Sequence, residues 1–208
     1  MRFTQKRFRL TGTDSMLGSC PANQEVFTEF LVGKTKTPEE RQAALADVNN
    51  IDENLEKGTT VFYRDSNGGL ILKGYQIKGF FKAAAKALKD QLNLKNYLSK
   101  VDTFVFILEK DIPIMRDGKQ IMEPDGYLER PQRCETAQGP RVSLAKSEEI
   151  KTDWYIDVTV RVVENAGTAK SVPIDMDMIE DFLDYGALSG LLQWRNAGHG
   201  TFEYKEID

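Results

Sequence analysis

The stretch that decides the fold is Trp154-Tyr-Ile-Asp-Val-Thr-Val-Arg-Val-Val163. Apolar and polar side chains alternate along it with a period of two, which is the pattern of a β-strand that buries one face. The inward positions are Trp154, Ile156, Val158, Val160 and Val162, and the outward positions are Tyr155, Asp157, Thr159 and Arg161. This regularity predicts a β-sheet with an apolar core on one face.

The patterns on either side of this strand predict two helices and three further strands. The strands are Arg2–Leu10, Thr103–Leu108 as a central strand, and Thr201–Ile207; the helices are Gln76–Leu92 and Met176–Tyr185, the second of them stopped by Gly186. With inserted segments at about 13–75 and 109–152 left out, the order is strand, helix, strand, strand, helix, strand. This order is the ferredoxin-like βαββαβ plan of an α+β fold, and we expect one domain over residues 1–208.

The two insertions carry patterns of their own. In the first, Thr37-Pro-Glu-Glu40 predicts the start of a helix that runs to about Val48. Further along, Asp65-Ser-Asn-Gly-Gly69 separates Thr60–Arg64 from Leu70–Lys73 and predicts a hairpin. The second insertion is too long for a plain connection and is rich in arginine. It is read either as a gripping loop or as a disordered surface loop.

Composition limits the chemistry that the chain can perform. The two cysteines, Cys20 and Cys134, are isolated, and His199 is the only histidine. A disulfide framework, a thiolate zinc site and a histidine-rich metal site are therefore not expected, and no cofactor motif is present. We also expect a cytoplasmic protein without a membrane partner, because no apolar run approaches ~20 residues and the first residues lack a signal-peptide pattern.

Charge is distributed unevenly along the chain. The formal net charge is −4, which differs from the basic surplus usual in proteins that coat nucleic acid. Residues 64–100 nevertheless hold eight lysines and arginines against two aspartates, whereas residues 174–208 hold eight acidic residues against two basic ones. The two segments are interpreted either as surfaces that join copies head to tail or as ordinary solvated helix faces.

The loop Gly186-Ala-Leu-Ser-Gly-Leu-Leu-Gln-Trp-Arg-Asn-Ala-Gly-His-Gly200 is the most distinctive connection in the chain. Its glycines permit close backbone approach to a ligand, and Trp194 and Arg195 add a stacking surface and a charge. These features suit a polyanion with unpaired bases. The alternative is a long connection whose glycines only make turns.

Three stretches resemble the RAMP superfamily of CRISPR-associated proteins, in particular the repeated backbone subunit of multi-subunit effector complexes. The first is Asp65-Ser-Asn-Gly-Gly-Leu-Ile-Leu-Lys-Gly-Tyr-Gln-Ile-Lys-Gly-Phe-Phe-Lys-Ala-Ala84, which is similar to a hairpin followed by a Pro-Gly-Ser-Ser-Leu-Lys-Gly-type helix start. The second is Arg130-Pro-Gln-Arg-Cys-Glu-Thr136 through Ala145-Lys-Ser-Glu-Glu-Ile150. The third is Gly198-His-Gly-Thr-Phe202, which resembles a Gly-Tyr-Gly-Arg-Phe ending.

The resemblance implies a subunit that holds single-stranded guide RNA and assembles with copies of itself or with other effector-complex subunits. The RNA would cross the helix start, the protruding insertion and the terminal loop, where helix-start N–H groups favour phosphate. The expected RNA-binding residues are Lys73, Lys78, Gly79, Lys82, Arg130, Arg133, Arg141, Trp194, Arg195, Gly198, His199 and Gly200. Lys73-Gly-Tyr-Gln76 departs from the family pattern, as does the acidic net charge, which leaves room for a phage-borne relative.

Two other functions stay open at this level. One is an endoribonuclease that uses His199, or Asp47 or Asp52 in the first insertion, although none of the three sits in a matching catalytic motif. The other is a protein-binding mimic that inhibits a CRISPR complex, which the acidic balance favours. We assign no catalytic residue and no metal ligand from the sequence.

Overall fold

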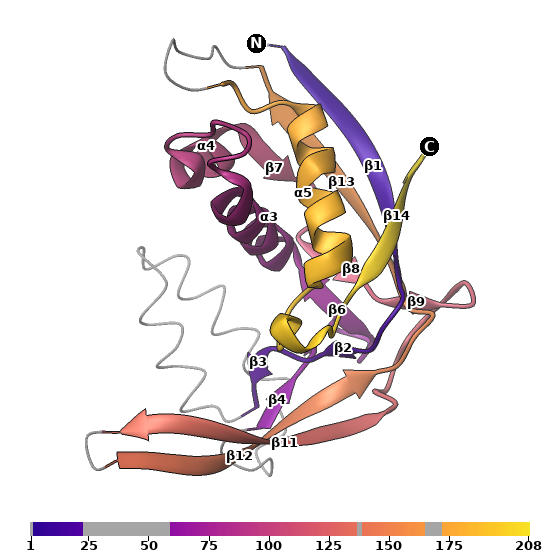
Figure 1. The fold of residues 1–208 in the computed structure, drawn as a ribbon. Coiled ribbons are helices and arrows are strands. Elements are labelled where there is room, and N and C mark those ends of the chain that lie inside the picture. Colours follow the sequence, from indigo (N-terminus) through magenta and orange to yellow (C-terminus); the bar gives the residue numbers. More distant parts are fainter. Residues whose placement is uncertain (1, 23–58, 137–138, 165–171) are drawn as a thin grey trace, which may run out of the picture.

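The computed structural model describes residues 2–22, 59–136, 139–164 and 172–208. A single antiparallel sheet with helices on one face forms its main body (Figure 1). The strands that define this sheet follow the order β7-β13-β1-β14, the order of the ferredoxin-like fold. They are β1 (Phe3–Gly12), β7 (Val105–Ile107), β13 (Tyr155–Val163) and β14 (Phe202–Ile207), and the helices are α3 (Gly74–Leu88), α4 (Tyr97–Phe104) and α5 (Met176–Ser189). The predicted α+β fold class and βαββαβ order are confirmed.

The core lies between this sheet and the helices. Strand β13 turns Trp154, the residue before it, and its even-numbered residues inward, and all of them are buried as predicted. Trp154 fixes the end of β1 through two hydrogen bonds. Its indole Nε1 donates to the Asp14 carbonyl at 2.9 Å, and its backbone carbonyl accepts from the Gly12 N–H at 2.7 Å. Thr159 faces outward but is also buried, and its backbone N–H donates to Glu109.

Two smaller sheets extend the body. The hairpin predicted around Asp65–Gly69 is confirmed, because β5 and β6 pair antiparallel in a sheet with β8. Their bounds are β5 (Tyr63–Arg64), β6 (Leu70–Lys73) and β8 (Asp111–Pro113). The other sheet contains β2 (Met16–Leu17), β3 (Cys20–Pro21), β4 (Thr59–Val61), β11 (Gly126–Thr136) and β12 (Gly139–Ile150). The helix predicted from Thr37 to Val48 lies outside the described residues.

The second insertion forms a long two-stranded ribbon rather than an irregular loop. Strands β11 and β12 pair from Gly126↔Glu149 to Thr136↔Gly139 and project from the body (Figure 1). Before them, β9 (Met115–Arg116) and β10 (Lys119–Gln120) make a short hairpin beside β13. Arg116 anchors the base of the ribbon, because its guanidinium forms two hydrogen bonds of 2.9 and 2.7 Å with the Asp125 carboxylate.

Two predictions about element ends are wrong. Thr103–Leu108 is not a central strand: α4 continues to Phe104, and only Val105–Ile107 form β7 at the sheet edge. Gly186 does not stop its helix either. Helix α5 continues to Ser189, and Gly190, with φ +77°, ends it. Gly186 is instead a packing position, because a Cβ there would overlap the rings of Phe80 and Phe202.

The two helical glycines should respond in opposite ways to alanine. Gly79 is exposed on α3, and a Cβ there meets no atom within 4 Å, so Gly79→Ala should stabilise the fold by about 0.5–1 kcal/mol through helix propensity. Gly186→Ala should destabilise it by about 1–3 kcal/mol, because the core has no room for the methyl group. Urea unfolding monitored by circular dichroism checks both values, and a shift of equal sign for the two variants would contradict the packing described.

Candidate nucleic-acid interface

Arg130 is a buried cation at the base of the ribbon. It lies on β11, and only 7% of its surface is exposed. Its guanidinium donates to the Ser147 hydroxyl at 3.3 Å and to the Gln193 side-chain oxygen at 3.0 Å. Ser147 is on β12, whereas Gln193 belongs to the terminal loop, so the arginine ties the ribbon to that loop.

The positive charge of Arg130 has no carboxylate partner among the described side chains. Its two hydrogen-bond acceptors are neutral, and its Nε is buried without an acceptor. Burial therefore lowers the pKa of the Arg130 guanidinium from its ordinary value. A buried charge without a counter-charge is costly, which makes this position a candidate site for an anion.

Trp194 lies directly over this cation. The Arg130 guanidinium carbon is 4.6 Å from the centre of the Trp194 ring, and Trp194 is 42% exposed. The imidazole of His199 stacks on the same indole with ring centres 5.1 Å apart and an interplanar angle of 12°. Ser15, just beyond the end of β1, holds His199 through a 2.9 Å contact between its hydroxyl and the His199 Nδ1. Arginine, tryptophan and histidine thus form one stacked group, in which the Trp194 indole is the exposed member.

The terminal loop holds this group through an uncommon backbone conformation. Leu192 and Trp194, on either side of Gln193, have φ values of +60° and +55°. Bulky residues rarely adopt this left-handed region, at a cost of about 1–2 kcal/mol each. Gly190 and Gly200 let the two ends of the loop pack together, since a Cβ on either would overlap backbone atoms of the opposite end.

A polar network joins the loop to the ribbon below the stacked group. The Gln193 side-chain oxygen also lies 3.4 Å from the hydroxyls of both Thr60 and Ser147, which are 2.8 Å from each other. The next residue on β12, Glu148, is buried and accepts hydrogen bonds from the Phe62 N–H at 2.7 Å and from Arg64 at 3.0 Å. These contacts fix β12, and with it Arg130, relative to the core.

The other predicted residues of the terminal loop are near the stacked group. Arg195 and Gly198 begin and cap a short 3₁₀ helix, η2 (Arg195–Ala197), beside Trp194. Arg195 is partly exposed and makes no ion pair within the described part of the chain. A Cβ on Gly198 would point into open space, although its φ of +91° favours glycine. The side chains of Arg133 and Arg141, farther along the ribbon, lie outside the described residues.

The predicted residues of α3 are placed differently. Lys73 is buried and pairs with Asp111 at 2.9 Å. Lys78 and Lys82 both turn toward α4, where Lys78 donates to the Asp102 carbonyl at 3.0 Å and Lys82 pairs with the Asp102 carboxylate at 2.6 Å. Burial lowers the pKa of Lys78. The structure therefore brings together Arg130, Trp194 and His199, but gives the lysines local partners of their own.

Sequence reasoning missed four polar residues of this site. Gln193, Ser147, Thr60 and Ser15 lie on four separate segments of the chain, and no spacing pattern links them. Ser147 shares a face of the ribbon with Arg130, because Arg130 pairs with Ala145 and Ser147 is two residues further along β12. This placement depends on the register of the ribbon. The others depend on the way the terminal loop folds over the ribbon.

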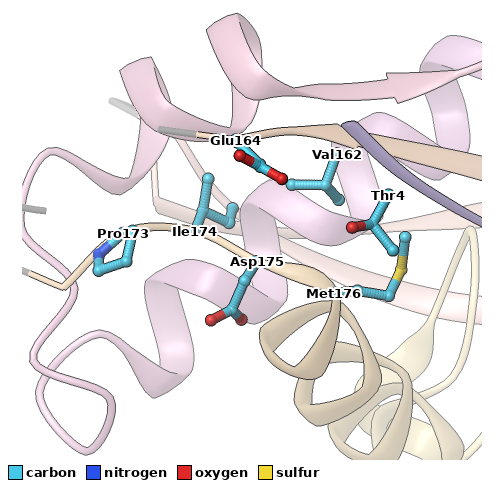
Figure 2. Close-up of a pocket in the computed structure, with 7 residues that line it drawn as sticks. All are labelled: Thr4, Val162, Glu164, Pro173, Ile174, Asp175 and Met176. Atoms are coloured by element: carbon cyan, nitrogen blue, oxygen red, sulfur yellow. The ribbon is translucent and has the colours of Figure 1, made fainter. Parts of the chain in front are cut away.

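Other features of the described chain are less suited to a polyanion. A pocket of about 200 Å³ opens where α5 begins (Figure 2), and two carboxylates line it. Its lining residues are Thr4, Val162, Glu164, Pro173, Ile174, Asp175 and Met176. Within residues 2–22, 59–136, 139–164 and 172–208, no group of three metal-binding side chains gathers. No helix in these ranges has the length and apolarity required to cross a bilayer.

Comparison with known proteins gives distant structural similarity. No family model matches the chain, and no curated protein matches it. The chain is similar to one chain in the cryo-EM structure of the Type III-B Cmr-beta bound to cognate target RNA, with a TM-score of 0.47 and 11% identity. The match covers 100% of this chain but 60% of that chain, less than two thirds of its length. A likeness this distant carries no argument about function.

The loop glycines give a test of the backbone that positions the stacked group. Gly190→Ala should destabilise the protein more than Gly198→Ala. Alanine at position 198 must adopt a left-handed conformation, at a cost of about 1–2 kcal/mol. Gly190, with φ 77° and ψ 174°, lies in a region that almost only glycine adopts, and a Cβ there would also meet the His199 carbonyl. Thermal unfolding of the two variants measures the difference. Equal losses of stability would show that the ends of the loop do not pack as described.

Proposed function

We propose that this protein is a RAMP-like subunit that binds single-stranded RNA, with Arg130, Trp194 and the terminal loop as the contact site. The observation that carries the proposal is the buried guanidinium of Arg130, stacked under an exposed indole without a carboxylate partner among the described side chains. A phosphate at this place supplies the missing negative charge. Binding then offsets a cost that the free protein bears in its folded state.

A nucleic acid strand suits the site better than a small anion. Trp194 offers an exposed aromatic surface beside the cation, and base stacking on such a surface contributes about 1–3 kcal/mol per base. Arg195 adds a second, solvent-accessible positive charge on the same loop. An isolated phosphate uses only the charges, whereas a strand uses the ring as well.

The assembly of copies along a strand stays a prediction of the sequence. Acidic side chains of α5 gather at its exposed face. Partial burial of the Asp181 carboxyl, together with neighbouring carboxylates such as Asp184, raises the pKa of Asp181. This surface is chemically opposite to the Arg130 site. We propose it as a contact for basic surfaces of a neighbouring copy rather than for RNA.

Arg130→Met tests the RNA site while preserving the fold. Methionine fills much of the same volume without a charge, so we expect the melting temperature to equal or exceed that of the wild type. Affinity for a fluorescein-labelled polyuridine oligonucleotide should fall about ten- to hundredfold, measured by fluorescence anisotropy. Leu188→Ala, at an 84% exposed position on α5, is the matched control and should leave both quantities unchanged.

Salt dependence and stacking separate the contributions of the loop residues. Arg195→Ala should lower the slope of log affinity against log salt by about 0.7, the value for one phosphate contact on a single strand. Trp194→Ala should cost about 1–3 kcal/mol of binding energy. Unchanged RNA affinity and salt slope in Arg130→Met, Arg195→Ala and Trp194→Ala would overturn the proposed RNA site. Salt-insensitive binding to a protein would instead favour the protein-binding mimic of a CRISPR subunit.

A further inference from the structure

The outer face of the main sheet carries a second group of aromatic and cationic side chains. The helices α3, α4 and α5 cover the opposite face (Figure 1). Along the central strands, the residues that alternate with the buried ones point outward, and Phe3 on β1 and Arg161 on β13 are among them. On the neighbouring edge strand, Phe106 is the direct partner of Arg161. These three residues lie side by side across three strands.

Arg161 is held in place between the two phenylalanines. Its guanidinium carbon is 4.3 Å from the centre of the Phe3 ring. Its Nε and one Nη donate to the Gln5 side-chain oxygen at 3.0 and 2.7 Å, which fixes the plane of the guanidinium. Phe3 and Phe106 are 49% and 42% exposed. The positioned guanidinium and the two exposed rings lie together on this face, and we name the group the Phe3–Arg161–Phe106 platform.

The charges around this platform favour an anionic partner. Gln5, the hydrogen-bond acceptor of Arg161, is neutral, and no ion pair of Arg161 is found in the described part of the chain. On the same face, Asp157 is shared by Arg7 and Arg9, at 3.5 and 2.7 Å. On β1, β13 and β14, the basic side chains that point outward outnumber the acidic ones. The basic residues are Arg7, Arg9, Arg161 and Lys205, and the acidic residues are Asp157 and Glu203. This face is thus locally positive in a protein with a net charge of −4.

Lys78 extends the platform at the sheet edge. Its ammonium nitrogen lies 5.3 Å from the centre of the Phe106 ring. That nitrogen also donates to the Asp102 carbonyl at 3.0 Å, so the Lys78 side chain is held against the ring. One of the lysines predicted from the sequence to contact RNA therefore lies beside this platform.

We propose that the Phe3–Arg161–Phe106 platform is a second binding surface for single-stranded nucleic acid. Bases stack on the two rings and on the guanidinium plane, and phosphates lie near Arg161 and Lys78. The platform is separate from the Arg130 site, because β1 runs from Phe3 to the turn that carries Ser15 and spans about 30 Å at ~3.3 Å per residue. The observations that support the platform are independent of those that support the Arg130 site.

The test uses the full-length protein and a polyuridine oligonucleotide that carries 4-thiouridine. The double variant Phe3→Ala/Phe106→Ala removes only exposed rings, so the fold should persist, and its affinity should fall about five- to fiftyfold. Arg161→Gln should lower the salt slope by about 0.7. Lys119→Ala, an exposed lysine on β10, is the charge control and should change neither quantity by more than twofold.

Crosslinking separates this proposal from the Arg130 site. Irradiation followed by peptide mapping should give crosslinks in the peptides that contain Phe3 or Phe106, and these crosslinks should persist in Arg130→Met. Their absence from the wild type, when crosslinks near Trp194 are present, would overturn the platform and leave the first site standing. If Phe3→Ala/Phe106→Ala binds the oligonucleotide with wild-type affinity, the platform is also overturned as a nucleic-acid site. If the same variant also changes the mass of the oligomer, the platform is a protein contact.

Discussion

The antiparallel ladder between β1 and β13 is the constraint on which the rest of the structure depends. It pairs the strands continuously from Phe3↔Val163 to Thr11↔Tyr155, and β14 pairs with the other edge of β1. Because β13 pairs with β1 from Phe3 to Thr11 and β14 supports it from Arg7 to Gly12, the two ends of β1 have fixed positions and directions. One end presents Phe3 on the open face of the sheet, and the other leads through Trp154 and Asp14 to the terminal loop. The two proposed binding surfaces are therefore held apart by a single strand.

The terminal loop and the buried Arg130 both lower the free energy of unfolding, and neither is required by the packing of the core. Leu192 and Trp194 adopt left-handed backbone conformations, and the guanidinium is buried with only neutral acceptors among the described side chains. Strain and an unneutralised charge at the same place are typical of functional sites, where the surrounding structure compensates for them. Here the compensation comes from the buried contacts of Glu148 and from the packing of Gly190 against the far end of the loop.

The sequence predicts the parts of this molecule that depend on periodicity. The strand at Trp154–Val163 has one buried face, and its pattern, together with the patterns of the neighbouring segments, predicted two helices and three further strands in the correct order. Element ends were harder to predict, because Gly186 is a typical helix stop by residue type but is fixed here by packing against two aromatic rings. The candidate site was predicted in part: Arg130 belongs to an arginine-rich segment, but its burial and its contact with Gln193 arise only when the ribbon and the loop meet.

The length of the ribbon has a consequence for solubility. Strand β12 has 12 residues, or about 40 Å at ~3.4 Å per residue, and β11 forms the outer edge of its sheet. Unpaired N–H and C=O groups along such an edge invite pairing with other chains. Pro131 in β11 lacks an N–H, and the charged Glu129, two residues before it, opposes close approach of an apolar strand. Replacement of this proline would therefore expose a longer uninterrupted edge and favour aggregation through the ribbon, even if the folded core were unchanged.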